Sequence, residues 1–148
     1  MFDVITFNHS FEHMNDFKEV LMHTKSILAD DGVCIIRVPV IPCYSWIHYG
    51  REWVQIDAPR HVNIFSIQGI AELCSQLGFS IKYVYDDSNY FQFVGSERNK
   101  QKLGYKNSAS LLQRITNPFL YLIKNAKANK LNKIGQGDQK CFILCKSN

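Results

Sequence analysis

The chain begins with a short apolar run that predicts a buried β-strand. Residues 2 to 7 are apolar or β-branched except for Asp3, and the run is too short for a helix of ordinary length. Such runs are typical of central strands in a parallel sheet, where both faces are covered. Polar residues from Asn8 to His13 follow at once, so they mark the end of this strand.

The next segment carries residues at helical spacing that predict a helix with one buried face. These residues are Phe17, Val20, Leu21, Thr24, Ile27 and Leu28. Asp16 and Glu19 form a capping-box pattern at its start, and Gly32 marks its end. Residues 33 to 39 then predict a second strand, so a right-handed parallel crossover is the simplest assembly. The carboxyl ends of both strands then share one edge of the sheet, where ligands bind in such folds.

A long segment without a regular pattern, residues 40 to 65, predicts a binding loop or lid instead of a plain connection. Ser66 then caps a predicted helix that ends at Gly78, and Ile81 to Tyr85 predict a strand. Residues 140 to 146 predict the last strand, which we expect to be antiparallel.

Residues 88 to 139 are interpreted as a basic amphipathic insertion before the last strand. Asn117-Pro118 predicts a break or kink within it. Because the sequence shows neither a repeat nor a low-complexity linker, we expect residues 1 to 148 to form a single α/β domain.

Composition and cysteine spacing limit the kinds of protein to which the chain can belong. The chain has 148 residues, of which 46% are hydrophobic, and no apolar run reaches the roughly 20 residues of a membrane-spanning helix. The N-terminal residues lack the pattern of a signal peptide, which predicts a cytoplasmic protein. Five cysteines without a C-x-x-C pair indicate reduced core residues, and we expect no metal site. A reactive thiol at Cys43, in the long loop, is the alternative for that residue.

Charge is divided unevenly along the chain. Residues 1 to 97 hold 6 Lys or Arg against 12 Asp or Glu, whereas residues 98 to 148 hold 11 against 1. The basic part therefore faces water, a membrane surface or lipid-linked substrate, or nucleic acid, and few aromatic residues interleave with the lysines to favour nucleic acid. Peripheral contact with a membrane is thus the alternative to a purely cytoplasmic location.

Several motifs together resemble a known enzyme family. They are F-D-V-I-x-x-x-x-x-x-E-H at residues 2 to 13, L-A-D-D-G at 28 to 32, V-P at 38 to 39, W-V-Q-I-D-A-P-R-H-V-N-I-F-S at 53 to 66, and L-G-F at 77 to 79. The pattern resembles the C-terminal half of class I S-adenosylmethionine-dependent methyltransferases that modify quinones, sugars and lipids. The resemblance covers residues 2 to 87 and, more weakly, 140 to 146. It implies a partial Rossmann-like sheet whose N-terminal cofactor-binding half is missing.

The resemblance also implies roles for individual residues. Asn8, His9, Ser10 and Glu12 would border the methionine end of S-adenosylmethionine. His61 and His13 are the candidate catalytic bases, and we favour His61 because its loop should cover the substrate. The candidate substrate contacts are Tyr49, Trp53, Asp57 and Arg60. For each of these positions, simple packing or loop stabilisation is the alternative.

Members of this family begin with a strand and a glycine-rich, G-x-G-x-G-like turn that precede the part matched here, and the sequence has no such turn before residues 2 to 7. Its only G-x-G, Gly135-Gln136-Gly137, comes so late that we interpret it as a turn before the last strand. The first strand would then be an open, apolar sheet edge. Two hypotheses follow. The chain is part of a methyltransferase acting on a small-molecule or lipid-linked acceptor, or it is a non-catalytic module that pairs through this edge with a second copy or another chain.

Overall fold

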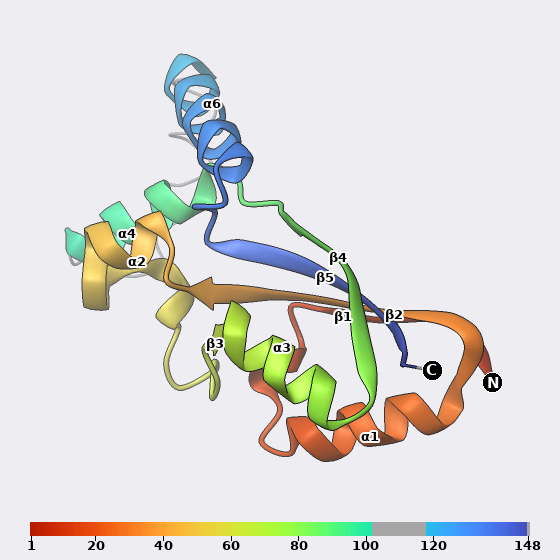
Figure 1. Ribbon diagram of the computed structural model, residues 1–148. Coiled ribbons are helices and arrows are strands. Elements are labelled where there is room, and N and C mark those ends of the chain that lie inside the picture. The colour runs from red at the N-terminus through yellow and green to blue at the C-terminus, as the bar shows by residue number, and fades with distance from the viewer. Residues whose placement is uncertain (102–117, 148) are drawn as a thin grey trace. The chain divides into compact units, whose positions relative to one another are not determined.

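A computed structural model describes residues 1–101 and 118–147 of the chain. The chain, drawn in Figure 1, forms two compact units. Unit 1 comprises Met1–Ile41, Ala58–Tyr85 and Gln139–Asn148, and unit 2 comprises Pro42–Asp57 and Asp86–Asp138. The single domain expected from the sequence stays a prediction, as does the 88–139 insertion, part of which lies outside the described residues.

Unit 1 is built on a sheet with the strand order β1-β2-β5-β4, to which β3 adds by pairing with β2. The strands are β1 (Phe2–Asn8), β2 (Leu28–Ile41), β3 (Phe65–Ser66), β4 (Phe79–Asp86) and β5 (Gln139–Lys146). β1 and β3 run parallel to β2, and β5 runs antiparallel to it. The parallel first pair and the antiparallel last strand predicted from the sequence are therefore confirmed.

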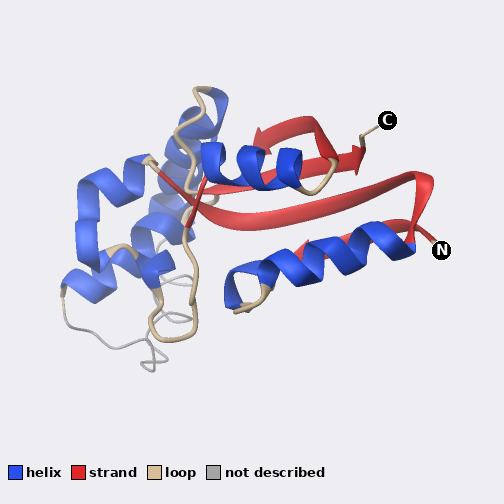
Figure 2. Cartoon of the chain, turned by 60° about the horizontal axis from the view of Figure 1, so that its bottom comes forward, coloured by secondary structure: helices blue, strands red, loops and turns tan. Residues whose placement is uncertain are grey.

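One face of this sheet is packed and the other is partly open. Along β2, Cys34, Ile36 and Val38 are buried, whereas the alternate positions Val33 and Ile35 are only half-buried. Helices α1 (Phe17–Ile27) and α3 (Ile67–Gln76) both contribute buried residues to the core cluster on the packed face. Figure 2 shows these two helices beside the strands.

The expectation that both faces of β1 are buried is wrong. Phe2 and Val4 are 59% and 54% exposed, and β1 pairs only with β2 among the strands of the sheet path. The open apolar edge, the other expectation for this strand, is what the described residues show. A parallel strand can occupy an edge when helices cover only one of its faces.

The helix α1 ends earlier than the sequence predicts, and its capping prediction is wrong. Leu28 already belongs to β2, where it is buried and pairs with Phe2. The register between β1 and β2 shifts after this pair, and Gly32 lies in the irregular stretch. A Cβ at Gly32 would lie 3.0 Å from the carbonyl oxygen of Phe2, so glycine permits the close approach. The Asp16 side chain makes no capping hydrogen bond.

The helix α3 forms as predicted. Its first turn is capped by Ser66, whose hydroxyl accepts a hydrogen bond from the Gly69 N–H at 2.9 Å. Beyond its last turn, Gly78 adopts a φ of 71°, a left-handed conformation that ends a helix at little cost for glycine.

Unit 2 contains the helices α2 (Tyr44–Tyr49), α4 (Phe91–Lys100) and α6 (Pro118–Lys133), together with two short 3-10 turns, Gly50–Glu52 and Val54–Ile56. The segment 40–65 is thus not irregular as predicted, because short helices and turns occupy most of it. α6 is described from Pro118 onward, and the predicted kink at Asn117-Pro118 reaches outside the described residues. No helix in the described ranges is long and apolar enough to cross a bilayer.

Candidate functional site

The carboxyl end of β1 carries the candidate site of unit 1. His9 follows the strand with a φ of 49°, a left-handed conformation that is costly for a residue other than glycine. Its N–H donates to the Arg37 carbonyl at 3.0 Å, which continues the pairing with β2. The chain then turns into a 3-10 turn, η1 (Phe11–His13). The left-handed residue thus redirects the chain and presents the η1 side chains at the sheet edge.

Phe11 anchors this turn in the core. Its ring has no exposed surface and lies 5.4 Å from the ring of Phe7, 6.0 Å from that of Phe17 and 5.4 Å from that of Phe65. Aromatic packing of this kind holds a short turn in one conformation. The position of Glu12, the next residue, is therefore fixed by the core.

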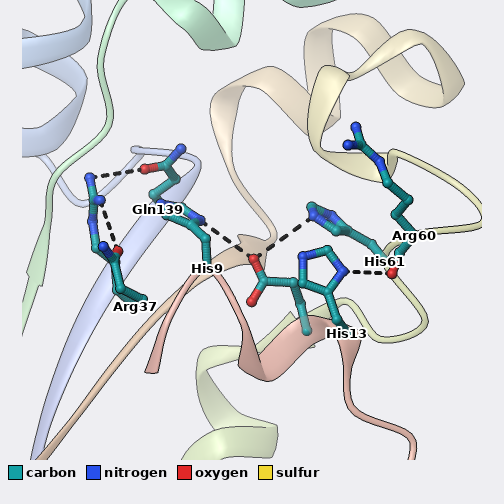
Figure 3. Close-up of polar contacts among 8 residues, drawn as sticks. His9, His13, Arg37, Arg60, His61 and Gln139 are labelled. Atoms are coloured by element: carbon teal, nitrogen blue, oxygen red, sulfur yellow. Dashed lines mark hydrogen bonds and ion pairs between the residues drawn. The ribbon is translucent and has the colours of Figure 1, made fainter. Parts of the chain in front are cut away.

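Glu12 is the central group of the site. It has no exposed surface, and neither carboxylate oxygen has a hydrogen-bond partner among the described residues. Its Oε1 lies 3.4 Å from His9 Nδ1 and 3.8 Å from His61 Nε2. Figure 3 shows these two contacts meeting on one oxygen of the carboxylate. A buried carboxylate between two imidazoles can balance positive charge on either ring.

Backbone hydrogen bonds hold the loop that carries His61 against η1. The N–H groups of Val62 and Asn63 each donate to the Glu12 carbonyl at 3.1 Å. The Asn63 side-chain amide donates to the Met14 carbonyl at 2.7 Å. Because these bonds join two segments of unit 1 that are far apart in the sequence, they place His61 beside Glu12.

His13 completes the cluster. Its Nδ1 lies 2.7 Å from the Arg60 carbonyl oxygen. A carbonyl only accepts hydrogen bonds, so Nδ1 carries the proton and the lone pair of the neutral ring lies on Nε2. The rings of His13 and His61 are 4.8 Å apart between centroids. Figure 3 shows that the Arg60 side chain extends away from the histidine rings.

Two further residues of the site were not predicted from the sequence. Arg37 on β2 donates to the side-chain oxygen of Asn8 at 3.2 Å and to that of Gln139 at 3.4 Å. The side-chain oxygen of Asn8 is therefore already engaged within unit 1. Sequence spacing gave no signal for this bridge, because Gln139 comes from the last strand. Ser10 contributes its carbonyl, which accepts the His13 N–H at 3.1 Å.

The other candidate substrate contacts, Tyr49, Trp53 and Asp57, belong to unit 2. Trp53 has no exposed surface with which to contact a substrate, and its indole N–H donates to Asp138 at 3.1 Å. The half-buried Tyr49 hydroxyl donates to Glu97 at 3.4 Å, and burial raises the pKa of Tyr49 to about 12. Asp57 adopts a left-handed φ of 36°.

The alternative of a reactive thiol at Cys43 can be compared with the structure. Cys43 is fully buried and its sulfur accepts the Trp46 N–H at 3.3 Å, so it caps α2 and offers no exposed thiol. Asp138, which the sequence did not indicate, is also buried, and burial raises its pKa to about 6. Gly135 and Gly137 lie in the turn between α6 and β5, as expected for the G-x-G motif.

The donor set fits only part of S-adenosylmethionine. The Glu12 carboxylate is buried and has no hydrogen-bond partner among the residues described, so it suits a ligand group that is cationic or carries a hydroxyl, and the cofactor has both at its methionine and ribose ends. Asn8, His9, Ser10 and Glu12 lie together at the carboxyl end of β1, where such folds bind ligands. The sequence has no glycine-rich strand-to-helix turn for the rest of the cofactor.

Comparison with solved structures shows the fold. The O-methyltransferase of a trans-AT PKS multienzyme from Brevibacillus brevis, solved with S-adenosyl-L-homocysteine, is 15% identical with a TM-score of 0.57, covering 99% of this chain and 44% of its own. A methyltransferase from Archaeoglobus fulgidus described as SAM-dependent is 21% identical with a TM-score of 0.54, covering 97% and 59%. A putative sarcosine dimethylglycine methyltransferase from Galdieria sulphuraria is 15% identical with a TM-score of 0.53, covering 99% and 53%.

The chain therefore spans about half the length of the solved structures it matches. No protein of curated function matches it significantly. A family model described as a methyltransferase domain matches residues 1–84, which include β1, the Glu12 cluster and the loop with His61. With a mixed sheet, a polar cluster at the end of its first strand and this match over more than half of its residues, the chain belongs to the methyltransferase domain family.

Proposed function

We propose that the chain takes part in S-adenosylmethionine-dependent methyl transfer to a small-molecule or lipid-linked acceptor. The observation that carries the proposal is Glu12, a buried carboxylate that lies between two histidines at the end of β1 and has no hydrogen-bond partner in residues 1–101 and 118–147. Folding alone does not favour such a group, so a ligand that completes its contacts is the simplest reason for it.

When bound, S-adenosylmethionine supplies an electrophilic methyl group on a positively charged sulfur. The residues of this chain then have two tasks, to orient the acceptor and to remove its proton. His61, 7% exposed in its side chain and 3.8 Å from Glu12, is the proposed base. Glu12 balances the charge that the ring gains with the proton, and Asn8, His9 and Ser10 border the cofactor. His13 is the second candidate base.

Two observations bear on the class of acceptor. The relative from Galdieria sulphuraria is named for sarcosine and dimethylglycine, which favours a small molecule. A lipid-linked acceptor is supported by α6, which carries exposed apolar residues, Phe119, Leu122 and Ile123, followed by lysines. A helix with exposed apolar and basic residues can lie at a membrane surface.

The first test is a calorimetric titration of the folded chain with S-adenosylhomocysteine. We expect micromolar binding that His9→Ala and Glu12→Ala abolish and that His23→Ala, at an exposed position on α1, leaves intact. If binding is found, a methyl-labelled cofactor offered with soluble and lipid-linked acceptors identifies the class. If the folded chain releases no heat, this chain alone is not a methyltransferase.

A second candidate function, a non-catalytic module that pairs through the edge of β1, is favoured by one observation. Phe2 and Val4 are exposed on a strand that has a neighbour on one side only within the described sheet path. Unpaired backbone groups next to apolar side chains promote strand pairing with another chain.

A further inference from the structure

We infer that Glu12, His13 and His61 form a binding site for a divalent transition-metal ion. One ligand atom from each side chain lies within 4.8 Å of the other two. Two imidazoles with one carboxylate form a ligand set that binds Zn²⁺, Mn²⁺, Fe²⁺ or Co²⁺ and leaves coordination positions open. This differs from the expectation of no metal site, because the ligands come from segments that only the fold brings together.

The burial of Glu12 is an independent observation in favour of the site. Its Oε1 has the two histidine nitrogens nearby, at 3.4 and 3.8 Å, but neither Oε1 nor Oε2 has a hydrogen bond within the part of the chain that the structure describes. Burying a carboxylate costs several kcal/mol unless opposite charge or hydrogen bonds offset the loss of water. A divalent cation between Glu12 and the rings of His13 and His61 supplies that charge.

The orientation of His13 is the one that metal ligands usually have. A metal-binding histidine commonly donates its second ring N–H to a carbonyl or carboxylate, which fixes the ring and its tautomer. His13 does this with the Arg60 carbonyl at 2.7 Å, so its Nε2 lone pair is left for an ion. Figure 3 shows the other nitrogen of this ring turned to the side of the carboxylate. The chain thus holds the outer contact of a metal site in place.

The distances between the three ligand atoms suit a metal ion once the side chains move slightly closer together. Metal–ligand bonds of about 2.0–2.2 Å place neighbouring ligand atoms roughly 3.3–3.6 Å apart in a tetrahedral site. The Glu12 and His61 atoms, at 3.8 Å, are close to this spacing. The widest separation, 4.8 Å at most, must shrink by roughly 1 Å, which the exposed side chain of His13 can supply.

The role of the ion rests on the proposed function. An acceptor hydroxyl that binds to an open coordination position becomes more acidic, because the cation stabilises the oxyanion. The oxygen keeps the electron pair of its O–H bond and the proton passes to water, so the acceptor is ready for methylation. In this form, His61 and His13 are ligands instead of bases, and the acceptor class is one that binds through oxygen.

The test uses the full chain after removal of metal with a chelator. MnCl₂ or CoCl₂ alone is titrated calorimetrically, and we expect one ion per chain. Glu12→Gln and His61→Ala should each weaken binding at least about tenfold, because loss of even an outer-shell partner of a ligand commonly costs that much. The matched controls are Glu19→Gln and His23→Ala, the same changes at exposed positions of α1, and they should bind like the wild type.

Each result decides the question. Cobalt spectra without a sulfur charge-transfer band support the carboxylate and imidazole ligands, whereas such a band would assign the ion to cysteines and overturn the inference. Equal metal affinities of the wild type and Glu12→Gln would overturn the inference too, provided that circular dichroism shows both proteins to be folded. Metal binding without binding of S-adenosylhomocysteine would support the metal site and contradict the proposed function. Binding of S-adenosylhomocysteine without metal binding would support the proposed function and contradict the metal site.

Discussion

At the scale of single residues, Glu12 links the proposed function to a cost in stability. The metal-free chain holds this carboxylate without exposure and without hydrogen bonds among the described residues. A neutral amide of the same shape is cheaper to bury than a carboxylate. Glu12→Gln should therefore raise the free energy of unfolding by about 1–2 kcal/mol in the presence of a chelator. Urea unfolding measures this, with Glu19→Gln as the exposed control; a loss of stability would show that the contacts with His9 and His61 outweigh the burial.

Asp138 is a second buried carboxylate, and it predicts a pH dependence of unit 2. Burial raises its pKa from 3.8 to about 6 in the folded chain. Between these two values the folded state binds more protons than the unfolded state, so stability falls as the pH rises from about 4 to 6. Above pH 6 the cost is fully present and is on the order of 3 kcal/mol.

Asp138→Asn isolates this effect, because asparagine keeps an oxygen for the Trp53 indole N–H but cannot ionise. The variant should match the wild type near pH 4 and exceed it in stability by a margin that grows up to about pH 6. Both tryptophans of the chain, Trp46 and Trp53, lie in unit 2, so their fluorescence in urea follows the unfolding of this unit. A difference between the two proteins that does not change with pH would contradict the explanation.

At the scale of elements, short-range patterns predicted most strands and α3, whereas tertiary contacts decided the exceptions. Leu28 continues the helical spacing of α1, yet its pairing with Phe2 starts β2 four residues before the predicted end at Gly32. Register between strands is not visible in local periodicity. Similarly, α2 has six residues and is capped by Cys43, an uncommon capping residue, so the loop prediction had no local signal against it.

In the candidate site, too, the sequence indicated some features and tertiary contacts decided the others. The rule that ligands bind at the carboxyl ends of parallel strands, together with the family resemblance, indicated His9, Glu12, His13 and His61, and the structure brings these four together. Their chemical roles stay predictions. The burial of Glu12 and the contact of His13 with the Arg60 carbonyl depend on how the loop packs on η1, which no sequence pattern encodes.

At the scale of the whole molecule, the edge of β1 decides between the two proposed functions. If the chain pairs through this edge, sedimentation equilibrium should show association that increases with concentration. Val4→Lys should then shift the wild type toward monomer, because a charged side chain on an edge strand opposes pairing. Val4 is 54% exposed, so the substitution should change the free energy of unfolding by no more than about 0.5 kcal/mol.

Met22→Lys is the matched control for this experiment, because Met22 is 57% exposed and lies on the helix α1 and not on the edge strand. Equal effects of the two lysines would point to general repulsion and not to strand pairing. A wild type that stays monomeric at every concentration would contradict the hypothesis of a pairing module. The Glu12 cluster would then be the functional feature of unit 1. Association that Val4→Lys abolishes, with no binding of S-adenosylhomocysteine or metal, would instead favour the pairing module over the enzyme.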